Sequence, residues 1–377
     1  MSRLKLGMVG GGQGAFIGGV HRIAARIDDR WELVAGAFSS DPDRSKASAA
    51  ELNVAADRAY GSFAEMAQAE AARADGIDAV AIVTPNHMHA PPAVAFLNAG
   101  IHVICDKPLA ATMEQAQEIA DAVAASGKRF ILTHNYTGYP LIRQARQMVA
   151  DGELGDLRVV QVEYPQDWLA EETSNKQADW RTDPERSGAG GCVGDIGTHA
   201  YNLASFVTGL RAESLAADLD AFVPGRPVDD NVHVMLRFGG GVKGMLWASQ
   251  VAVGNENALR LRVYGTKGGI EWAQENPNVM SFTRFGEPKQ LLTRGGAGFI
   301  DAGARVSRIP PGHPEGYLEG FATIYSEAAA IVLNARDGTA LPEGLHAPGI
   351  EDGLDGMRFI AACIASSRDN GAWTALG

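Results

Sequence analysis

The sequence of 377 residues is poor in features that would place it in a specialised class. It has three cysteines, and their spacing matches neither a metal site nor a disulfide framework: Cys105, Cys192 and Cys363. The 45 acidic residues outnumber the 33 basic ones, and this balance disfavours nucleic acid and anionic membranes as partners. There is no apolar run of membrane-spanning length and no signal peptide before the first strand. We therefore expect a cytoplasmic protein that holds no metal.

What the chain does have is the size and apolar content of two globular domains. Its first part alternates short apolar strands with helices, which predicts a doubly wound parallel sheet, the Rossmann arrangement. The expected strands are residues 4–9, 33–38, 79–84, 101–105 and 129–133. We place this α/β dinucleotide-binding domain at residues 1–133.

Beyond Asn135 the pattern changes to strands without intervening helices. Residues 232–238 and 259–264 alternate apolar and polar side chains, which is typical of an antiparallel sheet with one covered face. Helices are expected at residues 316–335 and 351–367. We assign residues 134–377 to a C-terminal α/β domain with a large, mostly antiparallel open sheet, which binds the substrate and forms oligomers.

The first strand runs into a glycine loop and then a helix, the context in which such a loop can bind a dinucleotide. Glycine lets the backbone approach a pyrophosphate, and the helix N-terminus supplies N–H groups. The third position of the glycine pattern is either Ala15 or, with three inserted residues, Gly18. The candidate cofactor contacts of this loop are Gly10, Gly12, Gln13, Ala15, Phe16 and Ile17.

The end of the second strand normally decides between NAD and NADP. Ser39 and Ser40 stand there in place of an acid, Asp41 has the features of a helix N-cap, and Arg44 could reach a phosphate. We expect NAD or NADP, with NAD favoured. Polar residues that follow the later strands should line the same crevice and are further candidates: Thr84, Pro85, Asn86, His89, Asp106 and Lys107.

A second glycine-rich stretch, residues 187–199, ends in an acid and a base. Its five glycines could let the backbone pass close to a ligand, and a helix starting near Asp195 would place Asp195 and His199 on one face. Histidine exchanges a proton near neutral pH, and a carboxylate can orient it. The alternative interpretation is a glycine-rich turn with a helix-start aspartate and a structural histidine.

Together these motifs resemble the glucose–fructose oxidoreductase, inositol dehydrogenase and rhizopine-catabolism (Gfo/Idh/MocA) family. The resemblance rests on the glycine loop, Thr84-Pro85-Asn86 with His89, Asp106-Lys107-Pro108, Trp180-Arg181 and residues 191–199. It implies a homo-oligomer, a dimer or tetramer formed through the C-terminal sheet, that oxidises or reduces a hydroxyl or ketone of a sugar or cyclitol. By motif, the family's catalytic residues fall on Lys107, Asp195 and His199. Asp106 replaces the usual glutamate, which keeps the charge on a shorter arm.

Alcohol oxidation needs a base for the hydroxyl proton while nicotinamide takes the hydride. We expect His199 to be that base, Asp195 to orient it, and Lys107 to stabilise the developing alkoxide. We expect the three to meet at one substrate, although Lys107 comes from the other domain. Besides these three, the candidate substrate contacts are Asn135, Tyr136, Trp180, Arg181 and His313.

Two other functions fit the same motifs. Some relatives oxidise a sugar transiently to break a glycosidic bond, so an NAD-dependent glycosidase or lyase is the first alternative. A sugar-sensing regulator that has lost its chemistry is the second, and the presence of Lys107, Asp195 and His199 together argues against it.

Overall fold

The structure is a computed structural model that describes residues 3–377 and divides into two compact units. The first comprises Met1–Asn135 and Tyr317–Leu354, and the second comprises Tyr136–Gly316 and Asp355–Gly377. The predicted boundary after residue 133 lies two residues from the observed one. The predicted continuous domain 134–377 differs from the structure, because residues 317–354 belong to the first unit.

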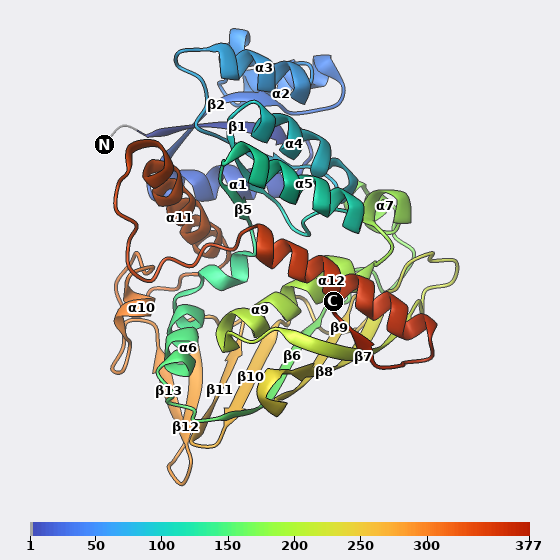
Figure 1. The fold of residues 1–377 in the computed structure, drawn as a ribbon, viewed down its shortest axis with the longest axis vertical. Coiled ribbons are helices and arrows are strands. Elements are labelled where there is room, and N and C mark those ends of the chain that lie inside the picture. The colour runs from blue at the N-terminus through green and yellow to red at the C-terminus, as the bar shows by residue number, and fades with distance from the viewer. Residues whose placement is uncertain (1–2) are drawn as a thin grey trace. The chain divides into compact units, whose positions relative to one another are not determined.

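The first unit is built on a five-stranded parallel sheet in the order β2-β1-β3-β4-β5 (Figure 1). Its strands are β1 (Leu4–Gly10), β2 (Trp31–Ala37), β3 (Ala79–Val83), β4 (His102–Cys105) and β5 (Phe130–Leu132). The connecting helices are α1 (Phe16–Ile27), α2 (Pro42–Glu51), α3 (Phe63–Ala72), α4 (Ala90–Asn98) and α5 (Met113–Ser126). The predicted parallel sheet is confirmed.

Two of these helices begin at a side-chain cap, and the sequence predicts the one at Asp41. The Asp41 carboxylate accepts hydrogen bonds from the backbone N–H groups of Asp43 and Arg44, at 2.9 and 3.0 Å. The Thr112 hydroxyl accepts one from Gln115 over 3.3 Å. Each cap satisfies N–H groups that a helix start leaves without a partner, and the predicted N-cap of α2 is confirmed.

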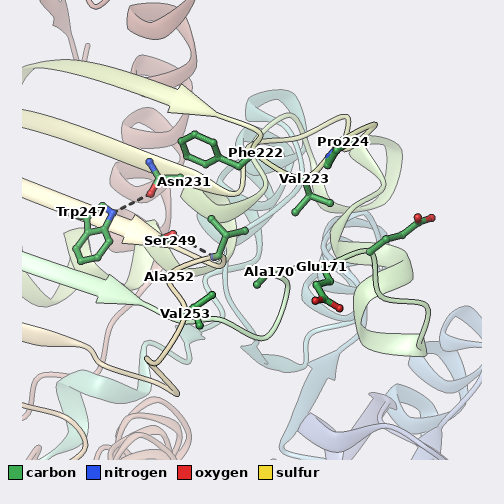
Figure 2. A pocket seen from close by; sticks show the side chains of 12 residues that line it. Ala170, Glu171, Phe222, Val223, Pro224, Asn231, Trp247, Ser249, Ala252 and Val253 are labelled. Atoms are coloured by element: carbon green, nitrogen blue, oxygen red, sulfur yellow. Dashed lines mark hydrogen bonds between the residues drawn. The ribbon is translucent and has the colours of Figure 1, made fainter.

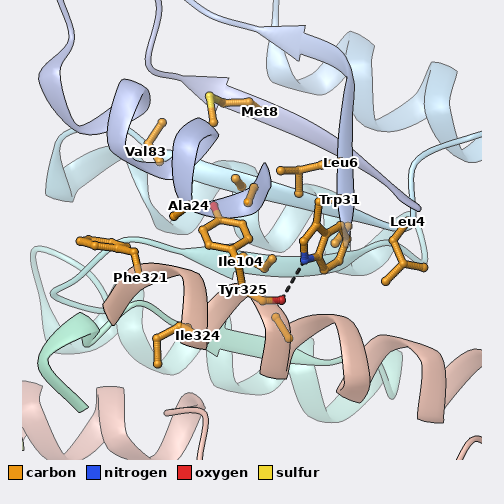
Figure 3. Close-up of a cluster of buried hydrophobic side chains, with 14 of the residues drawn as sticks. Leu4, Leu6, Met8, Ala24, Trp31, Val83, Ile104, Phe321, Ile324 and Tyr325 are labelled. Atoms are coloured by element: carbon orange, nitrogen blue, oxygen red, sulfur yellow. Dashed lines mark hydrogen bonds between the residues drawn. The ribbon is translucent and has the colours of Figure 1, made fainter. Parts of the chain in front are cut away.

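Helix α11 (Tyr317–Asp337) belongs to the first unit because its apolar face completes the core of that unit. Phe321 and Tyr325 pack in one buried cluster with Leu6 and Trp31 of the first two strands (Figure 3). The indole N–H of Trp31 donates to the Tyr325 carbonyl oxygen over 2.8 Å. No local pattern shows that a helix so late in the chain covers the first strands.

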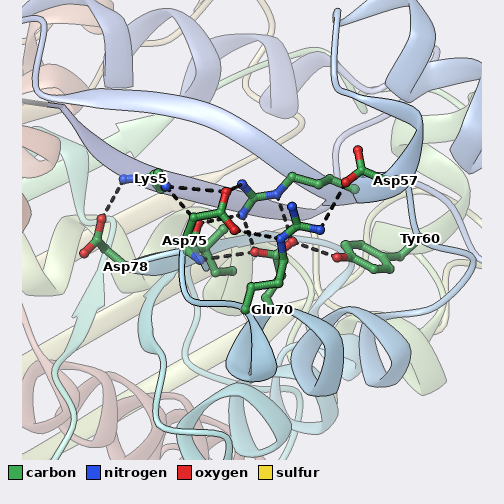
Figure 4. Close-up of polar contacts among 9 residues, drawn as sticks. Lys5, Asp57, Tyr60, Glu70, Asp75 and Asp78 are labelled. Atoms are coloured by element: carbon green, nitrogen blue, oxygen red, sulfur yellow. Dashed lines mark hydrogen bonds and ion pairs between the residues drawn. The ribbon is translucent and has the colours of Figure 1, made fainter.

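The connection between β2 and β3 is held by a buried ion pair, with Glu70 at its centre (Figure 4). Arg58 donates from Nε to Glu70 over 3.0 Å, and the Tyr60 hydroxyl donates to the same carboxylate over 2.7 Å. Burial and the neighbouring carboxylate raise the pKa of Tyr60 to about 12. The paired charges hold α3 against the sheet edge.

The second unit is built on a nine-stranded sheet in the order β13-β12-β11-β10-β6-β9-β8-β7-β14. Only β6 and β9 pair in parallel, so the predicted mostly antiparallel sheet is confirmed. Its strands are β6 (Leu157–Pro165), β7 (Ala212–Asp220), β8 (Asn231–Phe238), β9 (Lys243–Ser249), β10 (Arg260–Gly265), β11 (Gly268–Ala273), β12 (Val279–Arg284), β13 (Gln290–Thr293) and β14 (Thr374–Ala375). No pattern in the sequence is strong enough to predict β7, β13 and β14.

Helices cover one face of this sheet, and α9 packs against β6, β9 and β10 (Figure 1). The helices of the unit are α6 (Pro140–Ala150), α7 (Lys176–Arg181), α8 (Pro184–Ser187), α9 (Thr198–Thr208), α10 (Asp301–Ala304) and most of α12 (Ile350–Arg368). Along β8 the side chains alternate, with Val234 and Leu236 buried and Met235 exposed. Within residues 3–377, no helix combines the length and the apolar character that crossing a membrane would require.

Candidate active site

Asp195 and His199 lie on consecutive turns at the start of one helix. Residues Val193–Gly197 form a π-helical turn that continues directly into α9. Asp195 lies in the π turn and is half-buried, and His199 is buried in the first turn of α9. A π turn widens the helix locally, and such turns occur often at functional sites.

The glycines before this helix are required by the protein's own packing. A Cβ at Gly191 would lie 2.2 Å from the carbonyl oxygen of Asp229, and one at Gly190 would lie 2.6 Å from Val193. At Gly194, by contrast, a Cβ would meet no atom within 4 Å. The interpretation that all five glycines serve the approach of a ligand is therefore replaced, at Gly190 and Gly191, by close packing within the unit.

The helix start is anchored by Asp229, a residue that sequence reasoning missed. The Asp229 carboxylate accepts hydrogen bonds from the backbone N–H groups of Gly191 and Val193, at 2.7 and 2.8 Å. The Asp229 carbonyl oxygen accepts a third from Cys192 over 2.8 Å. Burial raises the pKa of Asp229 to about 6, although the two backbone donors oppose the rise. Its carboxylate thus satisfies N–H groups that an anionic ligand would otherwise bind.

Asp195 is held by two donors on the same oxygen. Gln250 donates from Nε2 to Oδ2 of Asp195 over 2.9 Å, and Arg181 donates from Nε over 3.2 Å. The Arg181 guanidinium is itself held by Gln177 over 2.7 Å and lies 4.2 Å from the ring centre of Trp180. The predicted substrate residues Arg181 and Trp180 are thereby brought together with Asp195, whereas Gln250 gave no signal in the sequence.

His199 packs against two tyrosine rings. Its ring centre lies 4.9 Å from that of Tyr136 and 6.3 Å from that of Tyr164, both at steep angles. The two phenol groups are hydrogen-bonded to each other, and the Tyr164 hydroxyl donates to the Asn257 side-chain oxygen over 2.8 Å. Burial raises the pKa of Tyr136. The imidazole is therefore bordered by neutral groups that can donate or accept hydrogen bonds.

The amide network continues from Asn257 into a pocket of ≈520 Å³. Asn257 donates to Gln274 over 2.9 Å, and both side chains line this pocket together with Glu256 and Glu275. His313 is exposed in the loop before α11, and the next residue, Pro314, lines this pocket. The pocket offers several donors and acceptors to a polar ligand.

In the first unit the glycine loop has the geometry that a dinucleotide phosphate needs. Gly10 has a left-handed φ of 81° at the end of β1. A Cβ at Gly18 would lie 2.4 Å from the Gly11 Cα, so Gly18 provides the close strand–helix packing of the third glycine. Helix α1 has no side-chain cap at Ala15 and no acid in its first turn. Its free N–H groups fit a diphosphate, and Phe16 beside them is 66% exposed.

A pocket of ≈500 Å³ adjoins this loop and includes the candidates Gly12, Gln13, Ala15 and Phe16. Arg22 shares the pocket and donates to the Gly11 carbonyl oxygen over 2.6 Å. After the end of β2, Ser39 is half-buried, whereas Ser40 and Arg44 are exposed. The Asp41 carboxylate caps α2, so this acid is used by the start of the helix.

The residues after β3 and β4 form a compact group around Asp106. Thr133 donates to the Asp106 carboxylate over 2.9 Å, and the backbone N–H of Lys107 donates over 3.0 Å. Burial alone would raise the pKa of Asp106, but hydrogen bonding to His21 and the charge of Lys107 hold it well below its usual range. Burial and the charge of Lys107 lower the pKa of His134 to about 3. An ionised Asp106 is thus fixed directly before Lys107.

His89 joins the two strand ends. Its imidazole is hydrogen-bonded to the carbonyl oxygens of Pro108 and Thr84, at 2.8 and 3.0 Å. Asn86 is buried in the turn before it, and burial lowers the pKa of His89. Asn86 and His89 therefore lie together. The hydrogen bonds of His89 give it a structural role between the end of β3 and the residues that follow β4.

Thiol or metal chemistry has no visible support in the described part of the chain. All three cysteines are buried, and burial raises the pKa of the Cys192 thiol well above its usual range, which disfavours the nucleophilic thiolate. Among residues 3–377, no group of three His, Cys, Asp or Glu side chains is arranged to hold a metal ion.

Two family models match most of the chain. Residues 4–136 match the model described as "Oxidoreductase family, NAD-binding Rossmann fold", and residues 142–271 match "GFO/IDH/MocA C-terminal domain". An uncharacterized oxidoreductase of Bacillus subtilis, YfiI, is 35% identical over 98% of this chain and 96% of its own length.

Solved structures of similar proteins cover nearly the whole chain. An oxidoreductase from Sinorhizobium meliloti is 56% identical, with a TM-score of 0.91 and 99% of each chain covered. An inositol dehydrogenase homolog from Azotobacter vinelandii, solved with NADH and myo-inositol, is 35% identical, with a TM-score of 0.93. That match covers 99% of this chain and 98% of the other.

Proposed function

Because the chain belongs to the Gfo/Idh/MocA oxidoreductase family, whose NAD-binding Rossmann domain it carries, we propose that it is a dehydrogenase of sugars or cyclitols. It transfers a hydride between the nicotinamide cofactor and a hydroxyl or ketone carbon. The observation that carries this proposal is the anchored pair of Asp195 and His199 at a helix start, beside a network of neutral side-chain donors and acceptors.

The cofactor would be held by the glycine loop and the uncapped start of α1. When bound, nicotinamide supplies the acceptor for the hydride. We assign the remaining contacts to the predicted strand ends, with Ser39, Ser40 and Arg44 at the ribose and Thr84, Pro85, Asn86 and Asp106 along the crevice. NAD is the favoured cofactor, and use of NADP depends on whether Arg44 binds the additional phosphate.

His199 serves as the general base for the reacting hydroxyl. A neutral imidazole can accept the proton near working pH, and the charge of Asp195 stabilises the imidazolium that results. Lys107 of the first unit keeps its predicted role, in which a cation stabilises alkoxide character as the hydride leaves. General acid–base help of this kind typically contributes about 10²–10⁴-fold in rate.

A polyol substrate suits the polar surroundings of His199. Hydroxyl-rich ligands need many hydrogen-bonding partners, and Asn257, Gln274 and Tyr164 supply amide and phenol groups there. Asn135, Tyr136, Trp180, Arg181 and His313 remain candidate substrate contacts. The myo-inositol of the Azotobacter vinelandii homolog suggests cyclitols as the first class to test.

Initial rates with a panel of inositols and sugars, each with NAD and with NADP, test this proposal. We expect net NADH formation with at least one free polyol. Cleavage of a glycoside without net NADH formation would instead support the glycosidase or lyase alternative. Binding of polyols with no turnover of either kind would support a sensor.

We also propose that the protein self-associates through the open face of the nine-stranded sheet. Met235 and Met245 lie opposite each other on β8 and β9 and are 56% and 49% exposed. Beside them is a pocket of ≈720 Å³ whose lining includes the apolar side chains of Phe222, Trp247 and Val253 and the carboxylates of Glu171 and Glu172 (Figure 2). Exposed apolar surface of this kind is typical of interfaces.

Sedimentation of Met235→Glu tests this interface. We expect the wild-type protein to sediment as a dimer or tetramer and the variant to dissociate, because a buried unpaired charge is costly. Leu341→Glu, at an exposed leucine of the first unit, is the control and should leave the assembly intact. A monomeric wild-type protein would contradict the proposal.

A further inference from the structure

Gln250 contacts Asp195 from the end of strand β9. Its side chain is 3% exposed, and its Nε2 donates to Oδ2 of Asp195 over 2.9 Å. Its main chain is fixed at the same time, since its N–H donates to the Asp230 carbonyl oxygen over 2.8 Å and its own carbonyl accepts from Leu169 over 3.1 Å. The amide therefore reaches Asp195 from a backbone that is hydrogen-bonded on both sides.

The alternation of β9 sets the direction of this side chain. Trp247 and Ser249 line the ≈720 Å³ pocket of Figure 2, whereas Ala248 is buried and Gln250 continues its side of the strand. A shift of one residue in register would turn the amide away from Asp195. The contact is thus built into the pairing of β8 with β9, in which Asn231 lies opposite Ser249.

Gln250 differs in kind from the second donor, Arg181. Arg181 brings a positive charge and lies at the end of the short helix α7, whereas Gln250 is a neutral amide directly after β9, an interior strand of the sheet. A neutral donor orients a carboxylate without adding charge and without titrating between acid and alkaline pH. Two donors on one oxygen also restrict rotation of the carboxylate more than either could alone.

We propose that Gln250 is a positioning residue, which holds the Asp195 carboxylate in the orientation in which it acts on His199. The inference rests on the proposed function for its catalytic consequence. In this proposal the sheet, through Gln250, and the helix that carries Asp195 and His199 together determine the geometry of the acid–base pair. Misplacement of a catalytic group by about 1 Å can cost about 100-fold in rate.

Replacement of the amide by an apolar side chain of similar size tests the inference. In Gln250→Met we expect kcat to fall about 10–100-fold while KM for NAD stays the same. Gln144→Met is the matched control. Gln144 is equally buried, and its Nε2 donates to the Gly298 carbonyl oxygen over 2.9 Å within the same unit. We expect the control to lower the melting temperature similarly and to leave kcat unchanged.

Gln250→Glu adds a readout that a merely structural role would not change. A protonated glutamate still donates to Asp195, but an ionised one repels it, and burial beside a carboxylate moves this ionisation to higher pH. The ratio of variant to wild-type kcat should therefore fall as the pH rises from about 6 to about 9. A constant ratio over this range, or wild-type kcat in Gln250→Met, overturns the inference.

A titration of Asp195 tests the contact with Gln250 without any measurement of turnover. Loss of a donor to the ionised form raises the titration midpoint, and we expect an increase of about one pH unit in Gln250→Met and none in Gln144→Met. The signal is the ¹³C resonance of the Asp195 carboxyl carbon, assigned with Asp195→Asn. An unchanged midpoint overturns the inference. If the wild-type protein oxidises no compound of the panel, the proposed dehydrogenase function fails, and this titration still tests the contact.

Discussion

Two glycine-rich segments of this protein lead into helices, yet their helix starts are satisfied in different ways. Residues 10–18 include the start of α1, which has no side-chain cap and no acid in its first turn. Residues 188–197 precede α9, and there the protein's own Asp229 carboxylate accepts from the N–H groups of Gly191 and Val193. A glycine-rich helix start is therefore an anion site only where no internal carboxylate occupies it.

This difference corresponds to different proposed roles, which are cofactor binding for the first segment and catalysis for the second. In the proposed function the first segment keeps its N–H groups for a cofactor phosphate, whereas the second uses them to fix the helix that carries Asp195 and His199. Four sets of variants test this difference between the two segments.

His199→Ala should have the largest effect, because it should lower kcat without changing the affinity for NADH. We expect kcat to fall about 10²–10⁴-fold because the general base is removed. The dissociation constant of NADH, measured by fluorescence, should stay the same because the cofactor binds at the first segment. Near-wild-type turnover that is independent of pH would contradict the assignment of His199.

Asp229 should make stability depend on pH. Its pKa rises from an ordinary 3.8 to about 6 in the folded protein, so the folded state retains a proton that the unfolded chain has lost. This contribution is greatest below pH 3.8 and is lost as the pH rises through 6, a change of about 3 kcal/mol.

Urea unfolding of the wild type and Asp229→Asn at several pH values measures this effect. The wild-type free energy of unfolding should decrease relative to that of the variant between pH 3.8 and pH 6. Parallel curves over this range would show that Asp229 does not titrate with a raised pKa.

Alanine at paired glycines tests whether each segment needs its glycines for packing. Gly18→Ala and Gly191→Ala place a Cβ 2.4 and 2.2 Å from backbone atoms, and we expect each to destabilise the fold by about 1–3 kcal/mol. Their controls are Gly19→Ala, which meets only the end of the Arg22 side chain at 3.9 Å, and Gly194→Ala. Both controls should unfold at or slightly above the wild-type temperature, and equal losses in all four variants would reject the packing argument.

Ala15→Asp should give the start of α1 a carboxylate, as Asp229 does for the second segment. A carboxylate at the N-cap of α1 should stabilise the fold by about 1 kcal/mol and weaken NADH binding about 10-fold, because it competes with the phosphate. Thermal melting and NADH fluorescence measure the two effects, and Ala15→Asn controls for the cap without the charge. Tighter NADH binding in the aspartate variant would contradict the account of this helix start.

The sequence predicts local features well, and the structure shows why. The caps at Asp41 and Thr112 lie within three residues of the N–H groups they satisfy, so a short pattern contains the whole interaction. The parallel order of β1 to β5 follows from strands alternating with helices. The family resemblance likewise rests on short motifs, and the family membership is confirmed.

What sequence reasoning missed are contacts between distant segments. Asp229 lies 38 residues from Gly191, and Gln250 lies 55 residues from Asp195. A carboxylate before one strand and an amide after another have no periodic signal, and their role depends on the register of β8 and β9. Helix α11 is a similar case, because only tertiary packing joins it to the first strands.

The central claim is that this protein moves a hydride from a polyol carbon to NAD. Its most direct test is mass spectrometry of the cofactor after incubation with NAD and fully deuterated polyols, with myo-inositol and glucose first. The account predicts NADH that carries one deuterium, formed by the wild type and lost in His199→Asn. Unlabelled cofactor with every polyol, or deuterium lost to solvent without net NADH, would contradict it.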